Sequence, residues 1–410
     1  ASREIEASIY SLPSAFFSAG EARRFLAAVH AAAPRRELLV LADPGMRRAL
    51  AGLPSLPGVR TLPTFGRPYS PWPRDPMSLV RRPGGGFALL LRPNLQRGRE
   101  EDASLGRALA AALPGDLDRR WGHPRWATAA VPFHNGQVLL TGDAAWITIH
   151  TLEPRILALL GLERVPVESF RSAEGLDRYL TAARAAAAEL SALYGRPARF
   201  VHPLPEAGDP AARLTAMRDL GGGAGIDLDS IVTLLPAASE TSGGRQRALV
   251  ADLSLGRGLL ATATAADFAS LRLGYGLAAD LDPARGLEST LGSERALALG
   301  RFLDATAGEL SAQGFEVRRL PLLLVPFTFL ADAAGLPPDG SFLIGWNNAV
   351  LETRNGELRA EAFASLIPAG DRAASATYGA LGTHLELLPA LPKSVVLGGG
   401  YRCASNHVRR

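Results

Sequence analysis

Short apolar segments alternate with amphipathic segments along this chain of 410 residues, and that alternation constrains the fold more than any other feature. Residues 21–33 place apolar side chains at helical intervals, and residues 37–42 follow as a short apolar strand. Segments 174–194 and 294–313 have the same helical spacing, and Gly314 after the second is a plausible helix C-cap. The pattern predicts an α/β fold with many short strands.

Further apolar strands are expected at 137–140, 230–235, 248–253, 315–320 and 394–397. Units of strand, strand, helix and strand return roughly every 60 to 90 residues, which suits similar modules packed around a common axis. Length alone would allow two or three domains, but no low-complexity linker divides the chain.

Composition narrows the class of protein. A hydrophobic content of 47% and a charged content of 20% are typical of a globular chain with a sizeable core. Lys393 is the sole lysine, and no block of basic residues is interleaved with aromatics, so nucleic acid is not an expected partner. No apolar run reaches the roughly 18 residues of a membrane span, so a membrane is not expected either.

One cysteine excludes an internal disulfide and leaves the compartment open. The chain begins at Ala1 without methionine, which fits a processed secreted protein as well as a cytoplasmic one, the cytoplasm being slightly favoured. The sequence does not decide between a monomer and a homodimer.

The C-terminal segment 397–405, LGGGYRCAS, contains that cysteine, Cys403. Three glycines allow close approach of a ligand to the backbone, and the guanidinium of Arg402 would favour a neighbouring thiolate, the reactive form of cysteine. The alternative is a buried, inert thiol. The flanking glycines and polar residues favour a nucleophile.

A second segment, 70–77 (SPWPRDPM), holds Arg74 and Asp75 between prolines in a stiff, extended loop. Such a loop can present Asp75 to a cationic ligand with little loss of entropy. The alternative is an ordinary Arg–Asp loop with Trp72 packed in the core.

A third segment, 225–232 (GIDLDSIV), contains Asp227 and Asp229. In a strand, these two carboxylates would lie on one face, where each raises the pKa of the other unless a cation lies between them. Such a pair indicates either a site or a solvated strand end.

Together, the three segments resemble the guanidine-modifying pentein superfamily, which includes arginine, agmatine and bacterial peptidylarginine deiminases and arginine amidinotransferases. GGGYRCAS resembles its cysteine motif, Trp72 to Asp75 its Trp-x-Arg-Asp motif, and Asp227 with Asp229 its His-x-Asp segment. Residues 346–348 (WNN) lie near its Tyr-x-Asn segment. The resemblance implies a pentein α/β propeller of five ββαβ-type modules around a pseudo-fivefold axis, with residues 1–410 as one catalytic domain.

The resemblance also implies roles for these residues. Cys403 would attack the guanidine carbon of a small-molecule or peptidyl guanidine, and Asp75 and Asp229 would clamp the guanidinium group. The other implied substrate-binding residues are Trp72, Arg74, Asn347 and Arg402. The activity would be that of a deiminase-like hydrolase or an amidinotransferase, with no cofactor. The histidines lack the paired spacing of a metal site, so no metal is expected.

Two positions depart from the family pattern. The family has a catalytic histidine where this chain has Asp227, and a glutamate on a neighbouring module where this chain has His134. One hypothesis is that His134 and Asp227 face each other with exchanged roles. Alternatively, a protonated Asp227 acts as the general acid, or acid–base chemistry is lost. In that last case the chain would be a pseudoenzyme that binds an arginine-like ligand or a protein partner.

Overall fold

The computed structural model describes most of the chain: residues 3–52, 54–64, 70–74, 76–81, 87–91, 102–112, 125–128, 137–164, 172–205, 212, 214, 227–236, 245–279, 293–332, 336, 340–397 and 399–409. Two predicted site residues, Asp75 and His134, lie outside these ranges. The described residues form an α/β fold, as the sequence predicts.

The described strands form five separate sheets. In each sheet an antiparallel pair is extended by a parallel strand, and one or more helices lie between the parallel partners in sequence. The first sheet has the order β17 (Ser405–Arg409), β1 (Ile5–Ser11), β2 (Glu37–Ala42), β3 (Val59–Pro63). The others are β4 (Met77–Arg81), β5 (Phe87–Leu91), β6 (Arg125–Thr128); β7 (Leu139–Leu140), β8 (Ala145–Ile147), β9 (Ala198–Phe200); β10 (Val232–Leu235), β11 (Arg247–Asp252), β12 (Glu316–Pro326), β13 (Ser341–Gly345); and β14 (Val350–Arg354), β15 (Glu357–Phe363), β16 (His384–Leu388).

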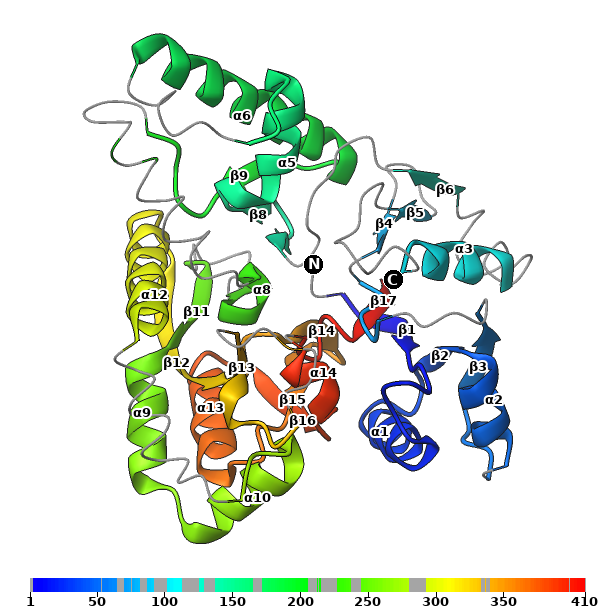
Figure 1. Ribbon diagram of the computed structural model, residues 1–410. Helices are drawn as coiled ribbons and strands as arrows, with labels where there is room; N and C mark the ends of the chain where they lie inside the picture. Colours follow the sequence, from blue (N-terminus) through cyan, green and yellow to red (C-terminus); the bar gives the residue numbers. More distant parts are fainter. Residues whose placement is uncertain are drawn as a thin grey trace.

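Most of the longer helices lie toward the outside of the molecule, and the short helix α8 lies nearer its middle (Figure 1). The described helices are α1 (Ala19–Ala32), α2 (Pro44–Ala51), α3 (Ala103–Ala112), α5 (Ile149–Leu160), α6 (Ala173–Tyr194), α8 (Leu228–Ile231), α9 (Leu253–Thr262), α10 (Ala265–Tyr275), α12 (Glu294–Ala312), α13 (Pro368–Ala380) and α14 (Pro392–Val396), with a 3₁₀ turn at Phe327–Phe329. None of these described helices is long and apolar enough to cross a membrane.

Local sequence explains the long elements. Helix α1 begins with a capping box, in which Ser18 accepts from the backbone of Glu21 and the Glu21 carboxylate accepts from the backbone of Ser18. Helix α6 begins at the N-cap Ser172 and ends at Gly195, which has the left-handed φ of 63°. Strand β2 is apolar and buried along almost its whole length, as expected of a strand between two parallel neighbours.

Two predicted strands are wrong in part. Residues 394–397 belong mostly to helix α14, because Pro392 occupies the first turn, where a fixed φ and a missing N–H favour a helix start. The predicted strand 230–235 begins only at Val232, and the residues before it form the single turn of α8. Both differences affect the predicted site, because Asp229 lies in α8 and Cys403 follows α14.

The two ends of the described chain meet in one sheet. Strand β17 lies beside β1 (Figure 1) and pairs with it antiparallel, so that His407 lies opposite Ser8. The residues directly before β17 are thereby attached to the first module, and these residues include Cys403.

Helix α9 offers a matched test of packing. A Cβ on Gly256 would lie 2.0 Å from the Leu322 backbone oxygen, whereas a Cβ on Gly258 of the same helix would meet nothing within 4 Å. We therefore expect Gly256→Ala to lower the free energy of unfolding by about 1–3 kcal/mol through overpacking. Gly258→Ala should raise it by up to about 1 kcal/mol through helix propensity. Urea denaturation of both variants checks this, and equal effects would contradict the packing of α9 on β12.

Candidate active site

Cys403 lies in a tight turn between α14 and β17. The backbone N–H of Ala404 donates to the Gly400 oxygen at 3.1 Å, and we call residues 400–404 the cysteine turn. The Cys403 side chain is buried, with 2% of its surface exposed. Its position at a Gly-rich turn agrees with the sequence analysis, although a helix and not a strand leads into it.

Gly399 and Gly400 allow two side chains to lie directly on the backbone. A Cβ on Gly400 would be 2.4 Å from Asn348 Cβ, and a Cβ on Gly399 would be 1.8 Å from Trp72 Nε1. Any larger residue at either position would displace these side chains. The glycines therefore admit Asn348 and Trp72 to the cysteine turn.

Asn348 is the site residue that sequence reasoning missed. It precedes β14, and its Oδ1 accepts from the Cys403 backbone N–H at 3.1 Å. This contact orients the amide, because the oxygen must face the N–H and the NH₂ group must face the sulfur. Nδ2 lies 3.2 Å from Cys403 Sγ, 3.3 Å from Asp229 Oδ1 and 3.3 Å from Ser230 Oγ, so its two hydrogens are shared among three acceptors.

The predicted residue Asn347 faces elsewhere. Its Nδ2 donates to the Leu249 oxygen at 2.9 Å, and its own carbonyl accepts from Thr233 Oγ1 at 2.8 Å. Asn347 thus joins β10 and β11 to the segment before β14. The sequence alone could not distinguish the two neighbouring asparagines, and Asn348 is the one in contact with Cys403 Sγ.

Asp227 and Asp229 lie beside Cys403. Asp227 precedes α8 and Asp229 lies within it, so the two carboxylates are brought together by a helical turn and not by a strand. One oxygen of each carboxylate and Cys403 Sγ all lie within 4.8 Å of one another. Asp229 is fully buried, with Oδ1 accepting from Asn348 and Oδ2 3.6 Å from Arg402 Nη1.

Two carboxylates and a thiol make a cluster suited to a cation. Among the described residues this is the group whose spacing could hold a metal ion, with one sulfur and two oxygen ligands. A planar guanidinium fits the same cluster, since carboxylates bind it through charge-assisted hydrogen bonds. The expectation that no metal is required stays a prediction.

Arg402 is buried against this cluster. Its Nη2 donates to the Val138 oxygen at 3.0 Å. Burial, and next the nearby positive charge of Arg74, lower the Arg402 pKa to about 10, while Asp229 and Cys403 act in the opposite direction. Arg402 is therefore a cation at neutral pH that lies between Asp229 and the segment after Gln137.

The module that contains residues 137–148 also reaches Asp227. Gln137 Nε2 lies 3.5 Å from Asp227 Oδ1, and Gln137 is itself held by Thr148 and Thr151. Gln137, three residues after His134 in the chain, is thus a neighbour of Asp227. His134 lies outside the described residues, so the exchange of roles between His134 and Asp227 remains a prediction.

The segment with Trp72 and Arg74 is anchored through Ser70 and Trp72. Ser70 donates to Asp102 through its backbone N–H at 2.6 Å and its hydroxyl at 2.5 Å, and Trp72 Nε1 donates to Ser394 Oγ at 3.0 Å. The indole of Trp72 therefore packs on the backbone of Gly399, and the positive charge of Arg74 lowers the pKa of Arg402. Asp75, the next residue, lies outside the described ranges. The substrate-binding roles of Trp72 and Arg74 stay predictions.

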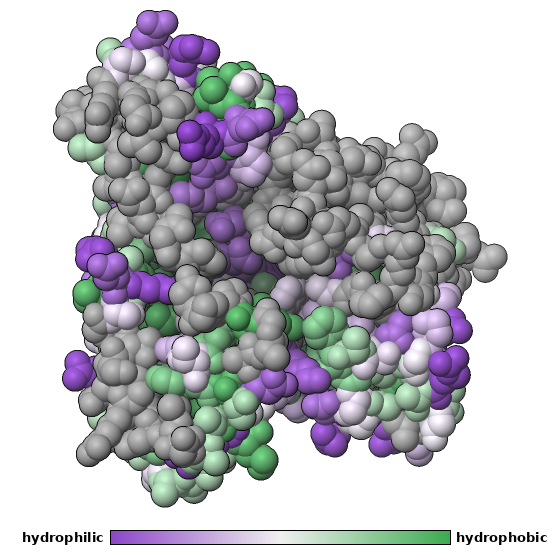
Figure 2. All heavy atoms as spheres, viewed as in Figure 1, coloured by the Kyte–Doolittle hydropathy of each residue, from purple (hydrophilic) through white to green (hydrophobic). Residues whose placement is uncertain are grey.

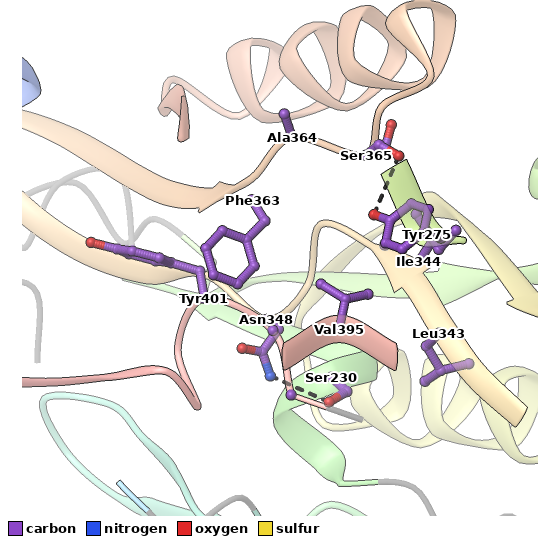
Figure 3. A pocket seen from close by; sticks show the side chains of 13 residues that line it. Ser230, Tyr275, Leu343, Ile344, Asn348, Phe363, Ala364, Ser365, Val395 and Tyr401 are labelled. Carbon is purple, nitrogen blue, oxygen red and sulfur yellow. Dashed lines mark hydrogen bonds between the residues drawn. The ribbon is translucent and has the colours of Figure 1, made fainter. Parts of the chain in front are cut away.

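On the face shown in Figure 2, hydrophilic residues lie in a recess near the middle of the molecule, where Figure 1 places β8 and α8. A cavity of about 30 Å³ also borders Asn348. Ser230, Asn348 and Tyr401 are among the residues that line it (Figure 3), as is Gly400. This volume is sufficient for one or two water molecules and too small for a guanidine substrate.

His407 supports the cysteine turn from β17. Its Nε2 lies 2.8 Å from Ser405 Oγ, and its Nδ1 lies 2.9 Å from Ser8 Oγ. The Ser405 hydroxyl donates to the backbone oxygen of Tyr401, so it must accept from His407 Nε2–H. The His407 Nδ1 then accepts from the Ser8 hydroxyl. Burial, then the charges of Arg409 and other arginines, keep the pKa of this imidazole well below its usual value.

The His407 pKa predicts a loss of stability in acid. Above about pH 6.5 the imidazole is neutral in both the folded and the unfolded chain. Below it, only the unfolded chain gains the proton, so the free energy of unfolding should fall by up to about 1.4 kcal/mol per pH unit. His407→Asn should remove this part of the pH dependence, as measured by urea denaturation between pH 8 and pH 5. The difference between variant and wild type at pH 8 reports the lost hydrogen bonds alone, and a difference that does not change with pH would contradict the prediction.

No protein-family model and no curated protein sequence matches the chain. Solved structures do. An agmatine deiminase from C. jejuni matches with a TM-score of 0.55 at 11% identity, covering 100% of this chain and 94% of that one. An agmatine deiminase of Enterococcus faecalis matches with a TM-score of 0.55 at 10% identity and the same coverage.

A Porphyromonas gingivalis protein that has been assigned as an arginine deiminase matches with a TM-score of 0.55 at 13% identity, covering 100% of this chain and 96% of that one. At such low identity the similarity concerns the fold, and it extends over the whole chain. The resemblance that the sequence indicates is thereby confirmed for the fold as a whole. This chain has the fold of the guanidine-modifying pentein superfamily.

Proposed function

We propose that this chain is a cysteine-dependent hydrolase that cleaves a carbon–nitrogen bond of a guanidine or amidine group. The observation that carries the proposal is the cluster of Cys403 Sγ with one carboxylate oxygen each from Asp227 and Asp229, all within 4.8 Å of one another. A cationic, planar group that enters this cluster has two carboxylates to bind it and a sulfur nucleophile beside its central carbon. The similar structures of agmatine deiminases support the same reaction class.

The chemistry proceeds in two steps. The Cys403 thiolate forms a bond to the guanidine carbon, the carbon–nitrogen bond to the departing amine breaks, and that amine takes a proton and leaves. An amidino-thioether remains on Cys403. Water then adds to the same carbon and loses a proton, the carbon–sulfur bond breaks, and a ureido product and the thiolate are released. Transfer to a second amine in place of water would make the chain an amidinotransferase.

Side chains around the sulfur have distinct roles in this mechanism. Asn348 Nδ2 donates to Cys403 Sγ and stabilises its negative charge. Asp229 orients Asn348 and Arg402 and contributes negative charge for the substrate cation. Asp227 moves the proton, either as the acid itself or as the partner that orients His134.

The architecture proposed with this function is a five-bladed propeller formed as one catalytic domain from residues 1–410. Five described sheets with a common order of strands support it. The site also draws on several units, since Gln137, Asp227, Asn348 and Cys403 follow or precede strands of different sheets. A crystal structure with the five sheets arranged otherwise than around one axis would overturn this part.

Product analysis tests the reaction. The protein is incubated with arginine, agmatine, creatine-like guanidines and arginyl peptides, and ureido product and ammonia are measured, with Cys403→Ala as the control. Product from at least one compound in the wild type and none in the variant supports the proposal. No product from any of them would favour a protein that binds an arginine-like ligand without turnover. Comparing the maximal rates of Asp227→Asn and His134→Ala, at substrate concentrations that offset weaker binding of the cation, then identifies the proton-transfer group: loss in both variants indicates a pair, and loss in the first alone indicates Asp227.

Covalent labelling tests the site without a known substrate. Chloroacetamidine carries a planar cation, and chloroacetamide is its neutral counterpart; both form a thioether with cysteine and release chloride. We define the amidine preference as the ratio of their labelling rates at Cys403, divided by the same ratio for glutathione. The proposal predicts a preference well above one in the wild type, and a loss of most of it in Asp227→Asn and Asp229→Asn.

A further inference from the structure

The cysteine turn is attached to the protein interior through Tyr401, a residue to which the proposed mechanism gives no part. The Tyr401 hydroxyl lies 2.9 Å from Glu361 Oε2 and 2.8 Å from the Tyr10 hydroxyl. Tyr401 is fully buried, and only 1% of Glu361 is exposed. Tyr401 is two residues before Cys403 in the same turn, so this contact helps to fix the position of the turn, beside the contacts from Asn348 and His407.

Glu361 is itself held by a buried ion-pair network. Arg36 donates to its two oxygens at 2.7 and 2.6 Å, and Arg354 lies 3.1 Å from Oε1. Arg36 and Arg354 also contact Glu352. Two guanidinium groups thus face two carboxylates, and they come from the segment before β2, from β14 and from β15. A network that joins separate sheets is a rigid support for the Tyr401 hydroxyl.

The charges of the network favour one direction for this hydrogen bond. Burial raises the pKa of Tyr401 well above its usual value, so the hydroxyl stays protonated. Burial alone would also raise the pKa of Glu361, but Arg36 lowers it, so Glu361 stays ionised. The Tyr401 hydroxyl therefore donates a hydrogen bond to the Glu361 carboxylate, and the Tyr10 hydroxyl donates a hydrogen bond to the Tyr401 oxygen.

The segment before Cys403 borders a cavity of about 30 Å³. Gly399, Gly400 and Tyr401 line it together with Asn348 and Phe363, so these groups lack close contacts where they face it. In Figure 3 the Tyr401 hydroxyl points away from Asn348, and its ring lies beside that of Phe363, with 5.5 Å between ring centroids. The hydrogen bond to Glu361 therefore opposes movement of the turn toward the cavity.

We propose that Tyr401 and Glu361 are positioning residues that hold Cys403 Sγ in register with Asp227 and Asp229. The inference rests on the proposed function, because it assumes that this register serves attack on a bound cation. It predicts that removal of one hydroxyl group, two residues from the nucleophile, weakens recognition of a cationic electrophile more than it weakens access to the sulfur.

The test measures the amidine preference in Tyr401→Phe. The ring and its packing are kept, and only the hydroxyl is lost. We expect the preference to fall by about tenfold, equivalent to about 1.4 kcal/mol, which is the size of one hydrogen bond. Labelling by chloroacetamide, which requires access alone, should not fall in parallel. The matched control is Tyr10→Phe, which removes the hydroxyl that donates to Tyr401 and leaves the bond to Glu361; its preference should stay within about twofold of wild type.

A double variant separates positioning from stability. In Tyr401→Phe the Tyr10 hydroxyl loses an acceptor inside the protein, whereas Tyr10→Phe/Tyr401→Phe removes both groups and should regain part of the lost thermal stability. We expect the amidine preference to stay low in the double variant. A preference that returns together with the melting temperature, or an equal loss in Tyr10→Phe, would overturn the positioning role. No preference in the wild type would overturn both this inference and the proposed function, while a preference that Tyr401→Phe retains would overturn only the inference.

Discussion

Asn348→Ala should lower the rate at which Cys403 forms its covalent intermediate by about a hundredfold. The substitution removes the amide that donates to Cys403 Sγ at 3.2 Å and accepts from the Cys403 N–H at 3.1 Å. A hydrogen bond to a charged group contributes about 1.5–3 kcal/mol and one to a neutral group about 1 kcal/mol, which together correspond to this factor. The measurement is the single-turnover rate with a substrate found in the product assay, or the rate of chloroacetamidine labelling.

Ser230→Ala is the comparison for this prediction. It removes one of three acceptors that share the Asn348 NH₂ group and leaves both contacts to Cys403. We expect an effect of about fivefold or less. An Asn348→Ala variant that folds and reacts at the wild-type rate would show that the sulfur is activated by other groups, and equal effects of the two substitutions would also contradict the role of Asn348.

Arg36→Met should lower the free energy of unfolding by about 3–5 kcal/mol. Arg36 is buried and donates to Glu361 and Glu352, so the shorter, neutral side chain leaves these carboxylates in the interior with one cation fewer. Such a loss is large because a buried charge without its partner keeps its full desolvation cost. Denaturation by urea measures the change.

Arg155→Met is the matched control, because Arg155 also forms a two-point contact with a carboxylate, Glu189, at 2.8 Å for each bond. These side chains are 28% and 35% exposed, and an exposed pair contributes only about 0.2–1 kcal/mol. Equal losses in the two variants would mean that burial does not determine the strength of the Arg36 network. Partial relief of the Arg36→Met defect at low pH is also expected, since protonation of the carboxylates then removes the unbalanced charge.

Much of the secondary structure follows from local sequence. The capping box of Ser18 and Glu21, the apolar run of β2 and the left-handed Gly195 after α6 each depend on neighbours within a few residues. Residues 394–397 show the limit, because a run of only three apolar residues, 395–397, is compatible with a strand or a helix. Pro392 is the local signal that favoured the helix α14.

The candidate site residues could be predicted from the sequence where the residue type itself is chemically distinctive, as with a thiol or a pair of carboxylates. Cys403 could be identified because a lone cysteine in a Gly-rich turn is unusual, and Asp227 with Asp229 because two carboxylates are so close in the chain. Asn348 was missed because an amide beside another amide has no distinctive pattern, and 55 residues separate it from the cysteine it contacts. The glycine at position 400 was the available sequence signal for such a neighbour, since the absence of a side chain there leaves room for another residue against the backbone.

By itself, the sequence determined the α/β class, the cysteine in its Gly-rich segment and the pair of carboxylates on which the proposal of a cationic ligand rests. These depend on side-chain periodicity and residue chemistry, both of which are local. Only the tertiary structure decided that Asn348 and not Asn347 faces the sulfur, that a helical turn pairs Asp227 with Asp229, and that Tyr401 ties the cysteine turn to Glu361. The physical reason is that each of these contacts joins groups whose directions depend on how separate sheets pack, which no single segment specifies.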